Sequence, residues 1–192
     1  MLSNKDYLIS LDSVVGDGDL GLTMSDGFNA AYEAVTDGME TDCGKLLYLA
    51  GKAMATKVPS TMGTLMASGL MKAGKELKGK TNLEPDDFIT LFQAYEDGVA
   101  ERGKAKIGEK TFLDGFHPGV AALRENVEAG SSLIDAAEKA ALAAKEGFEN
   151  ATSLLALHGR AATRGEESRK LKDPGAYVAV LIMEAFRNSL KG

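Results

Sequence analysis

The apolar residues of this chain recur with the 3.6-residue period of an α-helix, and no segment of any length alternates with the two-residue period of a β-strand. A chain with this pattern buries its apolar side chains by packing helices against one another. We predict helices over residues 4–13, 22–36, 43–56, 61–78, 85–101, 111–127 and 131–149, and a last helix that Asp173 and Pro174 open. The sequence therefore predicts an all-α bundle of about eight helices.

The length and composition predict one globular domain over residues 1–192, because we find no repeat, low-complexity segment or linker. The net charge of −6 argues against nucleic-acid binding, which needs a basic surface. We expect no membrane-spanning segment, because the chain has no uncharged run of about 18 residues. Residues 1–7 lack the apolar core of a signal peptide, and the single Cys43 fits a reducing compartment. We therefore expect a soluble cytoplasmic domain.

Asp12, Asp17 and Asp19 place three carboxylates within eight residues, and only Gly18 separates the last two. Carboxylates this close repel one another, so a cation among them would stabilise the fold. Mg²⁺ prefers oxygen ligands and commonly combines one or two carboxylates with the phosphates of a substrate. The helix predicted after this stretch would direct free N–H groups at such an anion. The sequence favours an acidic loop that holds Mg²⁺ against the phosphates of a nucleotide, and a solvated Asp-Gly turn is the alternative.

Other loops rich in glycine, hydroxyl groups or charge are candidates to join this acidic stretch at one end of a bundle. The segment 58–64 offers hydroxyl side chains at a helix start, either as a phosphate cradle or as an ordinary helix cap. The segment 103–110 offers lysines that could balance phosphate charge, or a solvated turn. Arg160, in a loop predicted over 159–172, could contact phosphate with two N–H groups or lie on the surface. From the residues alone, each pair of alternatives stays open.

The order of several short motifs resembles one known family. The motifs are Leu-Asp-x-x-Val-Gly-Asp-Gly-Asp-x-Gly from Leu11, Gly-Glu-Lys-Thr-x-x-Asp from Gly108, Gly-Arg-Ala from Gly159 and Asp-Pro-Gly-Ala from Asp173. In this order they resemble the nucleotide-binding L subunit (DhaL family) of dihydroxyacetone kinase, which is related to the C-terminal domain of single-chain, ATP-dependent dihydroxyacetone kinases. The resemblance runs from about Leu11 to the end of the sequence, which is nearly the whole chain.

The resemblance implies a barrel of eight antiparallel helices in a single domain, with the nucleotide and Mg²⁺ at one end. It implies that Asp12, Asp17 and Asp19 bind two Mg²⁺ ions that bridge the diphosphate. Arg160 matches a catalytic arginine on a loop that covers the site. Contacts to ADP or ATP are implied for a larger set of residues: Leu20, Gly21, Leu22, Thr23, Thr61, Met62, Gly103, Phe112, Arg160, Asp173, Pro174 and Gly175.

The resemblance also implies a kinase subunit that is active only with partners. In the multi-subunit version, ADP stays bound, a phosphorylated M subunit recharges it, and the resulting ATP phosphorylates a small ketose held on the K subunit. The chain departs from the family pattern at Leu20, where His is usual, at Thr23, where Asn is usual, and at Met62, where Ser is usual. These departures leave two alternatives: a paralogue acting on another small ketose such as a tetrulose, and a non-catalytic binding or regulatory module.

Overall fold

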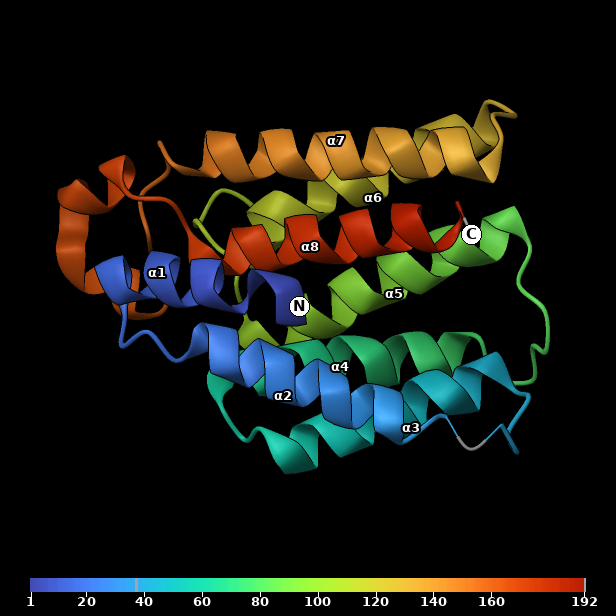
Figure 1. Cartoon of the computed structure of the whole chain (residues 1–192). Helices are drawn as coiled ribbons and strands as arrows, with labels where there is room; N and C mark the ends of the chain where they lie inside the picture. Colours follow the sequence, from blue (N-terminus) through green and yellow to red (C-terminus); the bar gives the residue numbers. More distant parts are fainter. Residues whose placement is uncertain (37, 192) are drawn as a thin grey trace. The chain divides into compact units, whose positions relative to one another are not determined.

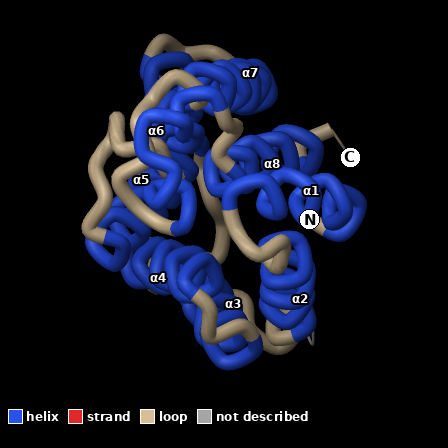
Figure 2. Tube along the Cα trace, turned by 90° about the vertical axis from the view of Figure 1, so that its left-hand side faces the viewer, coloured by secondary structure: helices blue, strands red, loops and turns tan. Residues whose placement is uncertain are grey.

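The computed structural model describes residues 1–36 and 38–191, and within them it contains helices and no strand (Figure 2). The α-helices are α1 (Lys5–Val15), α2 (Leu20–Glu33), α3 (Cys43–Lys57), α4 (Thr61–Glu76), α5 (Pro85–Gly103), α6 (Phe112–Glu128), α7 (Leu133–Ala151) and α8 (Pro174–Ser189). Two 3₁₀-helices, η1 (Leu2–Asn4) and η2 (Arg160–Lys170), complete the elements. The prediction of an all-α fold is therefore confirmed. Across the same residues, every helix is too short or too polar to cross a lipid bilayer.

Capping side chains explain why several helices begin where the sequence predicted. A side-chain oxygen at the N-cap accepts a hydrogen bond from one of the first backbone N–H groups, which have no partner inside the helix. Asp42 does this for the N–H of Lys45, and Ser132 for that of Asp135. Pro85 occupies the first turn of α5, where the N–H that proline lacks would have no partner.

The chain forms two compact units, each built from two separate segments. The first unit comprises Met1–Lys5 and Leu20–Lys104 and holds α2 to α5. The second comprises Asp6–Asp19 and Ala105–Gly192 and holds α6, η2, α7, α8 and nearly all of α1. Each unit is described by itself below, and the single domain expected over 1–192 stays a prediction.

In the first unit, α4 packs against α2, α3 and α5 (Figure 1). Glycines let the helix backbones touch: a Cβ atom on Gly44 of α3 would lie 2.5 Å from the carbonyl oxygen of Gly74 on α4. Further along α3, Gly51 faces Ala67, so the two helices run antiparallel. Gly103, the last residue of α5, faces Leu65 near the start of α4. The end of α3, the start of α4 and the end of α5 therefore share one end of this unit.

In the second unit, α6, α7 and α8 pack against one another (Figure 1). Gly115 of α6 faces Ala176 of α8, and one turn later Gly119 faces Met183, so α6 and α8 run parallel. Gly147, near the end of α7, lies against the backbone of the first turn of α6, so α7 runs antiparallel to both. The start of α6, the end of α7 and the start of α8 therefore lie at the same end of this unit.

Helix α1 packs its apolar side on α7 and α8. Leu11 contacts a buried cluster that includes Phe148, Ala151 and Ala176. One turn earlier, the ring of Tyr7 meets that of Tyr177 edge-on, with the ring centroids 4.8 Å apart. Because Ala151 ends α7 and Ala176 begins α8, the second half of α1 leads to the end of the unit where these helix ends gather.

The prediction of a loop over 159–172 was wrong, because Arg160–Lys170 is 3₁₀-helical on both sides of Gly165. Gly165 breaks the helix with a positive φ of 53°. This segment has no apolar stripe, so the periodicity used for prediction could not detect it. The helix predicted over 131–149 is α7, which ends two residues later, at Ala151.

Candidate functional site

The three aspartates of the acidic stretch lie together in the second unit. Asp12 is on the last turn of α1, while Asp17 and Asp19 lie in the short loop that follows. One carboxylate oxygen from each residue lies within 4.8 Å of the other two. Two glycines make this possible: a Cβ atom on Gly16 would come 2.5 Å from Asp12 Oδ1, and Gly18 has a φ of 74°, in the left-handed region.

The charges of this cluster are crowded and only partly balanced. The pKa of Asp19 is raised, chiefly by partial loss of water around its carboxylate and then by repulsion from Asp17 and Asp12. Arg160 acts in the opposite direction on the same pKa. Its Nη2 lies 2.5 Å from Asp17 Oδ2, in an ion pair whose side chains are 66% and 41% exposed. The guanidinium therefore stands where it offsets part of the negative charge.

The donor set suits a hard divalent cation. All three side chains offer carboxylate oxygens, the ligands that Mg²⁺ and Ca²⁺ prefer, and the set contains no sulfur or nitrogen donor. A divalent ion among these oxygens would remove the repulsion that raises the pKa of Asp19. Asp17 and Asp19 are exposed, so further ligands such as phosphate oxygens could reach an ion held there.

The 3₁₀-helix η2 carries Arg160 and contacts the end of α1. Besides the ion pair between Arg160 and Asp17, Arg164 donates a hydrogen bond of 3.1 Å to the carbonyl oxygen of Val14. The break at Gly165 lies directly after these two contacts. The first half of η2 is thus attached to the acidic cluster by two arginines, both of them exposed.

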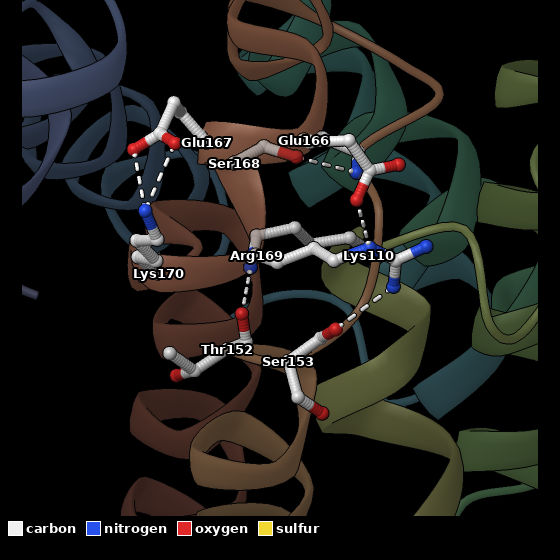
Figure 3. Close-up of polar contacts among 9 residues, drawn as sticks. Lys110, Thr152, Ser153, Glu166, Glu167, Ser168, Arg169 and Lys170 are labelled. Carbon is white, nitrogen blue, oxygen red and sulfur yellow. Dashed lines mark hydrogen bonds and ion pairs between the residues drawn. The ribbon is translucent and has the colours of Figure 1, made fainter.

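The second half of η2 is attached to the segment that follows α7 (Figure 3). The buried hydroxyl of Ser168 accepts a hydrogen bond from the backbone N–H of Ala156. The guanidinium of Arg169 donates to the carbonyl oxygen of Ser153 and to the carboxylate of Glu166. These contacts hold the second half of η2 against the segment that follows α7, and the first half of η2 carries Arg160.

The starts of α6 and α8 bring four of the predicted nucleotide contacts together. Asp173 caps α8 by accepting a hydrogen bond of 2.6 Å from the N–H of Ala176, and Pro174 takes the first position of the helix. A Cβ atom on Gly175 would lie 3.3 Å from the backbone nitrogen of Phe112, so these two residues are in contact. The ring of Phe112 is buried in the core, which leaves only its backbone for a ligand.

Lys110 is a buried residue whose importance the sequence did not reveal. It was interpreted either as a lysine that balances phosphate charge or as part of a solvated turn, and both interpretations were wrong, because its side chain is only 1% exposed. The ammonium donates hydrogen bonds of 2.8 Å to the carbonyl oxygens of Ala151 and Thr152, at the end of α7 (Figure 3). Its place directly before Thr111, which caps α6, is the one signal that could have indicated a structural role.

The remaining predicted contacts lie in the first unit, at the starts of two helices and the end of a third. The first turn of α2 holds Leu20 and Gly21, which are buried, Leu22, which is exposed, and Thr23, which is partly buried. Ser60 caps α4 by accepting from the N–H of Gly63, so this hydroxyl serves as the helix cap. Thr61 and Met62 form the first turn of α4, and Gly103 lies against Leu65 one turn further on.

The structure thus groups the predicted residues in two sets. In the second unit, Asp12, Asp17 and Asp19 each have an oxygen within 4.8 Å of the other two, Arg160 pairs with Asp17, and Phe112 contacts Gly175. In the first unit, Thr61, Met62 and Gly103 lie at one end of α4 and α5. The roles that the resemblance implies for both sets stay predictions.

A family described as the DAK2 domain matches residues 14–188. Among curated proteins, the chain is similar to the "PEP-dependent dihydroxyacetone kinase 2, ADP-binding subunit DhaL" of Listeria innocua, with 32% identity over 97% of this chain and 87% of that one. It is similar to the corresponding ADP-binding subunit of Escherichia coli, with 31% identity over 95% of this chain and 87% of that one.

Longer relatives and one solved structure match the chain over part of their own length. An L-erythrulose kinase of Pectobacterium atrosepticum is 32% identical over 96% of this chain, which corresponds to 32% of the relative. The crystal structure of the dihydroxyacetone kinase of C. freundii superposes with a TM-score of 0.74 at 22% identity, over 97% of this chain and 32% of that one. This last likeness concerns the fold.

Proposed function

The chain belongs to the DAK2 domain family, and from this we propose that it is the nucleotide-binding phosphotransferase subunit of a dihydroxyacetone kinase. Two of its relatives, 31–32% identical over nearly the whole chain, are named ADP-binding subunits of such kinases. The observation that carries the proposal is the cluster of three carboxylates, whose oxygens lie within 4.8 Å of one another beside Arg160.

In this proposal Asp12, Asp17 and Asp19 hold Mg²⁺, as one or two ions. The metal would supply positive charge that neutralises the phosphates of ADP or ATP and orients them for transfer. The three side chains provide the oxygen ligands, and the exposure of Asp17 and Asp19 leaves room for phosphate oxygens to complete the coordination.

Arg160 would stabilise the phosphoryl group during transfer. A guanidinium can donate two N–H groups to phosphate oxygens, and charge neutralisation is the main contribution that a protein makes to phosphoryl transfer. When the nucleotide is absent, Arg160 pairs with Asp17, and both side chains are exposed. An exposed ion pair is weak, so the arginine can exchange this partner for a phosphate.

The acceptor would bind to another protein. Phosphoryl transfer needs positioned phosphates and an acceptor hydroxyl with a base, and we assign no base for the acceptor to this chain. We propose a K-type subunit that holds the ketose, with a phosphocarrier M subunit recharging bound ADP. Relatives named as PEP-dependent and PTS-dependent kinase subunits support this arrangement.

The proposed acceptor is dihydroxyacetone, and a tetrulose such as erythrulose is the second candidate. The second candidate rests on two relatives named erythrulose kinases, at 31–32% identity. An assay with the neighbouring K-type subunit, offering each ketose with ATP or phosphoenolpyruvate as donor, separates the two acceptors. ADP binding without phosphoryl transfer in every combination would instead indicate a non-catalytic binding module.

Calorimetry of ADP binding tests the nucleotide site directly. We expect ADP to bind in excess MgCl₂ and to lose affinity about tenfold to a hundredfold in Asp17→Asn, as is typical when metal coordination is disturbed. Asp97→Asn, at an exposed position of α5, is the matched control and should bind as the wild type does. ADP affinity that is absent in the wild type, or that is independent of Mg²⁺, would contradict the proposed function.

A further inference from the structure

Lys110 is one of the large, fully buried residues among those that the structure describes, with 1% of its surface exposed. Lysines are almost never fully buried unless their charge is paired. Its ammonium donates to the carbonyl oxygens of Ala151 and Thr152, which belong to the last turn of α7, where carbonyls have no partner within the helix. Lys110 also has a φ of 60°, which is uncommon for a residue other than glycine. The buried anchor and the unusual backbone conformation occur at the same residue.

Two buried carboxyl groups, those of Asp114 and Asp173, interact with this ammonium through their charge. Asp114 accepts hydrogen bonds from the N–H groups of Gly108 and Thr111, and Asp173 accepts one from Ala176. Burial raises the pKa of Asp173 to about 6, and the positive charge of Lys110 opposes this shift. The pKa of Lys110 is lowered, chiefly by burial, while the two carboxyl groups act to raise it and Arg169 of η2 acts to lower it. Lys110, Asp114 and Asp173 therefore form one buried electrostatic group, and Arg169 acts on it from an exposed position.

This group connects the segments that carry several of the proposed nucleotide contacts. Lys110 precedes Phe112 by two residues, and Asp173 precedes Gly175 by two, while Gly175 touches the backbone of Phe112. The same anchor reaches η2: directly after Thr152, the carbonyl oxygen of Ser153 accepts a hydrogen bond from Arg169 (Figure 3). A displacement of the ammonium would therefore shift the starts of α6 and α8. It would also shift the second half of η2, the helix whose first half carries Arg160.

We propose that Lys110 is a positioning residue of the nucleotide site: it holds the start of α6, the end of α7 and the start of α8 in one arrangement without reaching the nucleotide itself. The inference rests on the proposed function, because the positioned residues are its nucleotide contacts. Loss of the positive charge removes the counter-charge of two buried carboxyl groups, and loss of the ammonium takes one donor from each of the carbonyl oxygens of Ala151 and Thr152. Both effects loosen the contact between Gly175 and Phe112.

The test compares two neutral variants, Lys110→Met and Lys110→Gln, with the wild type. Glutamine keeps an N–H donor for the two carbonyls and removes only the charge. If the methionine variant fails to fold, the glutamine variant tests the same prediction. The control is Lys139→Met, at an exposed lysine of α7. Calorimetry with ADP and MgCl₂ gives the affinity, and carboxyl-carbon NMR gives the titration of Asp173 in the absence of nucleotide and metal.

We expect the Kd for ADP to rise about tenfold in the Lys110 variants, which corresponds to 1.4 kcal/mol, and to stay unchanged in Lys139→Met. The titration midpoint of Asp173 should move from about 6 toward higher pH in the Lys110 variants, since a neighbouring positive charge lowers the pKa of a carboxyl group. A purely structural lysine would change the melting temperature and leave the Kd for ADP of the folded variants in place.

Two results would overturn the inference: a folded Lys110 variant that binds ADP as tightly as the wild type, or an Asp173 midpoint that does not move. A wild-type protein that fails to bind ADP would instead overturn the proposed function. The titration of Asp173 needs no nucleotide, so it still tests the coupling to Lys110 in that case.

Discussion

Asp12→Asn should stabilise the protein when no metal or nucleotide is present. Asp12 lies on the last turn of α1, where the negative end of the helix dipole disfavours a carboxylate. It also repels Asp17 and Asp19, whose oxygens lie within 4.8 Å. Asparagine has almost the same shape and removes the charge. The substitution therefore relieves two unfavourable interactions and creates no cavity.

The magnitude follows from the separation of the charges. Two unit charges 4.8 Å apart interact by about 0.9 kcal/mol in water. Salt at physiological ionic strength reduces this by about half, so the two pairs together contribute about 0.9 kcal/mol. The helix dipole adds about 0.3–1 kcal/mol. We expect the free energy of unfolding to rise by about 1.2–1.9 kcal/mol and the melting temperature by about 2–8 °C.

Urea denaturation in EDTA, followed by circular dichroism at low and at high salt, measures this change. The gain should be larger at low salt. Asp6→Asn is the matched control, because Asp6 is an exposed carboxylate at the opposite end of the same helix, where the dipole favours it. That control should lose about 0.3–1 kcal/mol.

Addition of MgCl₂ and ADP should reverse the order of stabilities. A ligand that binds only the folded state stabilises it, and Asp12→Asn removes one of the proposed metal ligands. The wild type should then be the more stable protein. An Asp12→Asn variant that is less stable than the wild type in EDTA, or whose gain does not depend on salt, would refute the argument that these carboxylates are crowded.

Further predictions concern other parts of the second unit. Arg160→Ala should raise the affinity of the nucleotide-free protein for Mg²⁺ by up to about fivefold, because it removes the exposed ion pair that competes for Asp17; calorimetry with MgCl₂ checks this. Gly115→Ala should lower the free energy of unfolding by about 1–3 kcal/mol in urea, because the added Cβ atom would lie 2.5 Å from the carbonyl oxygen of Ala176. Asp173→Asn should gain stability relative to the wild type, by about 1–3 kcal/mol, as pH rises from 4.5 to 7.5. The sign follows from the raised pKa of about 6: ionisation of the buried Asp173 carboxyl destabilises the folded wild type above that pH, and asparagine does not ionise.

The local parts of the fold and of the site could be predicted from the sequence. The 3.6-residue period located the α-helices, and capping residues such as Asp42 located helix starts, because both signals depend on neighbours within about four residues. The grouping of Asp12, Asp17 and Asp19 also followed from local spacing, since a helix turn and two glycines separate them.

Features that depend on distant partners escaped prediction. Lys110 looked like a loop lysine, because the carbonyls that hold it lie 41 and 42 residues later in the chain. The 3₁₀-helix η2 looked like a loop, because it is held by polar contacts such as that of Arg169 with Ser153 and not by an apolar stripe. The burial of the Phe112 ring against Phe116 likewise became visible only once the core was assembled.

The arrangement of helix ends in the second unit explains why a lysine is buried there. Because α6 and α8 run parallel, two positive helix ends lie together, and such ends favour an anion such as phosphate. The antiparallel α7 brings a negative end to the same place, which would weaken that preference. Lys110 donates to the last carbonyls of α7 and so cancels this negative end.

The end of α1 is also negative, and the carboxylates of Asp12, Asp17 and Asp19 there can attract a cation. Helix direction and side-chain charge therefore agree: the starts of α6 and α8 suit phosphate, the end of α1 suits Mg²⁺, and Lys110 offsets the negative end of α7, which would disfavour phosphate.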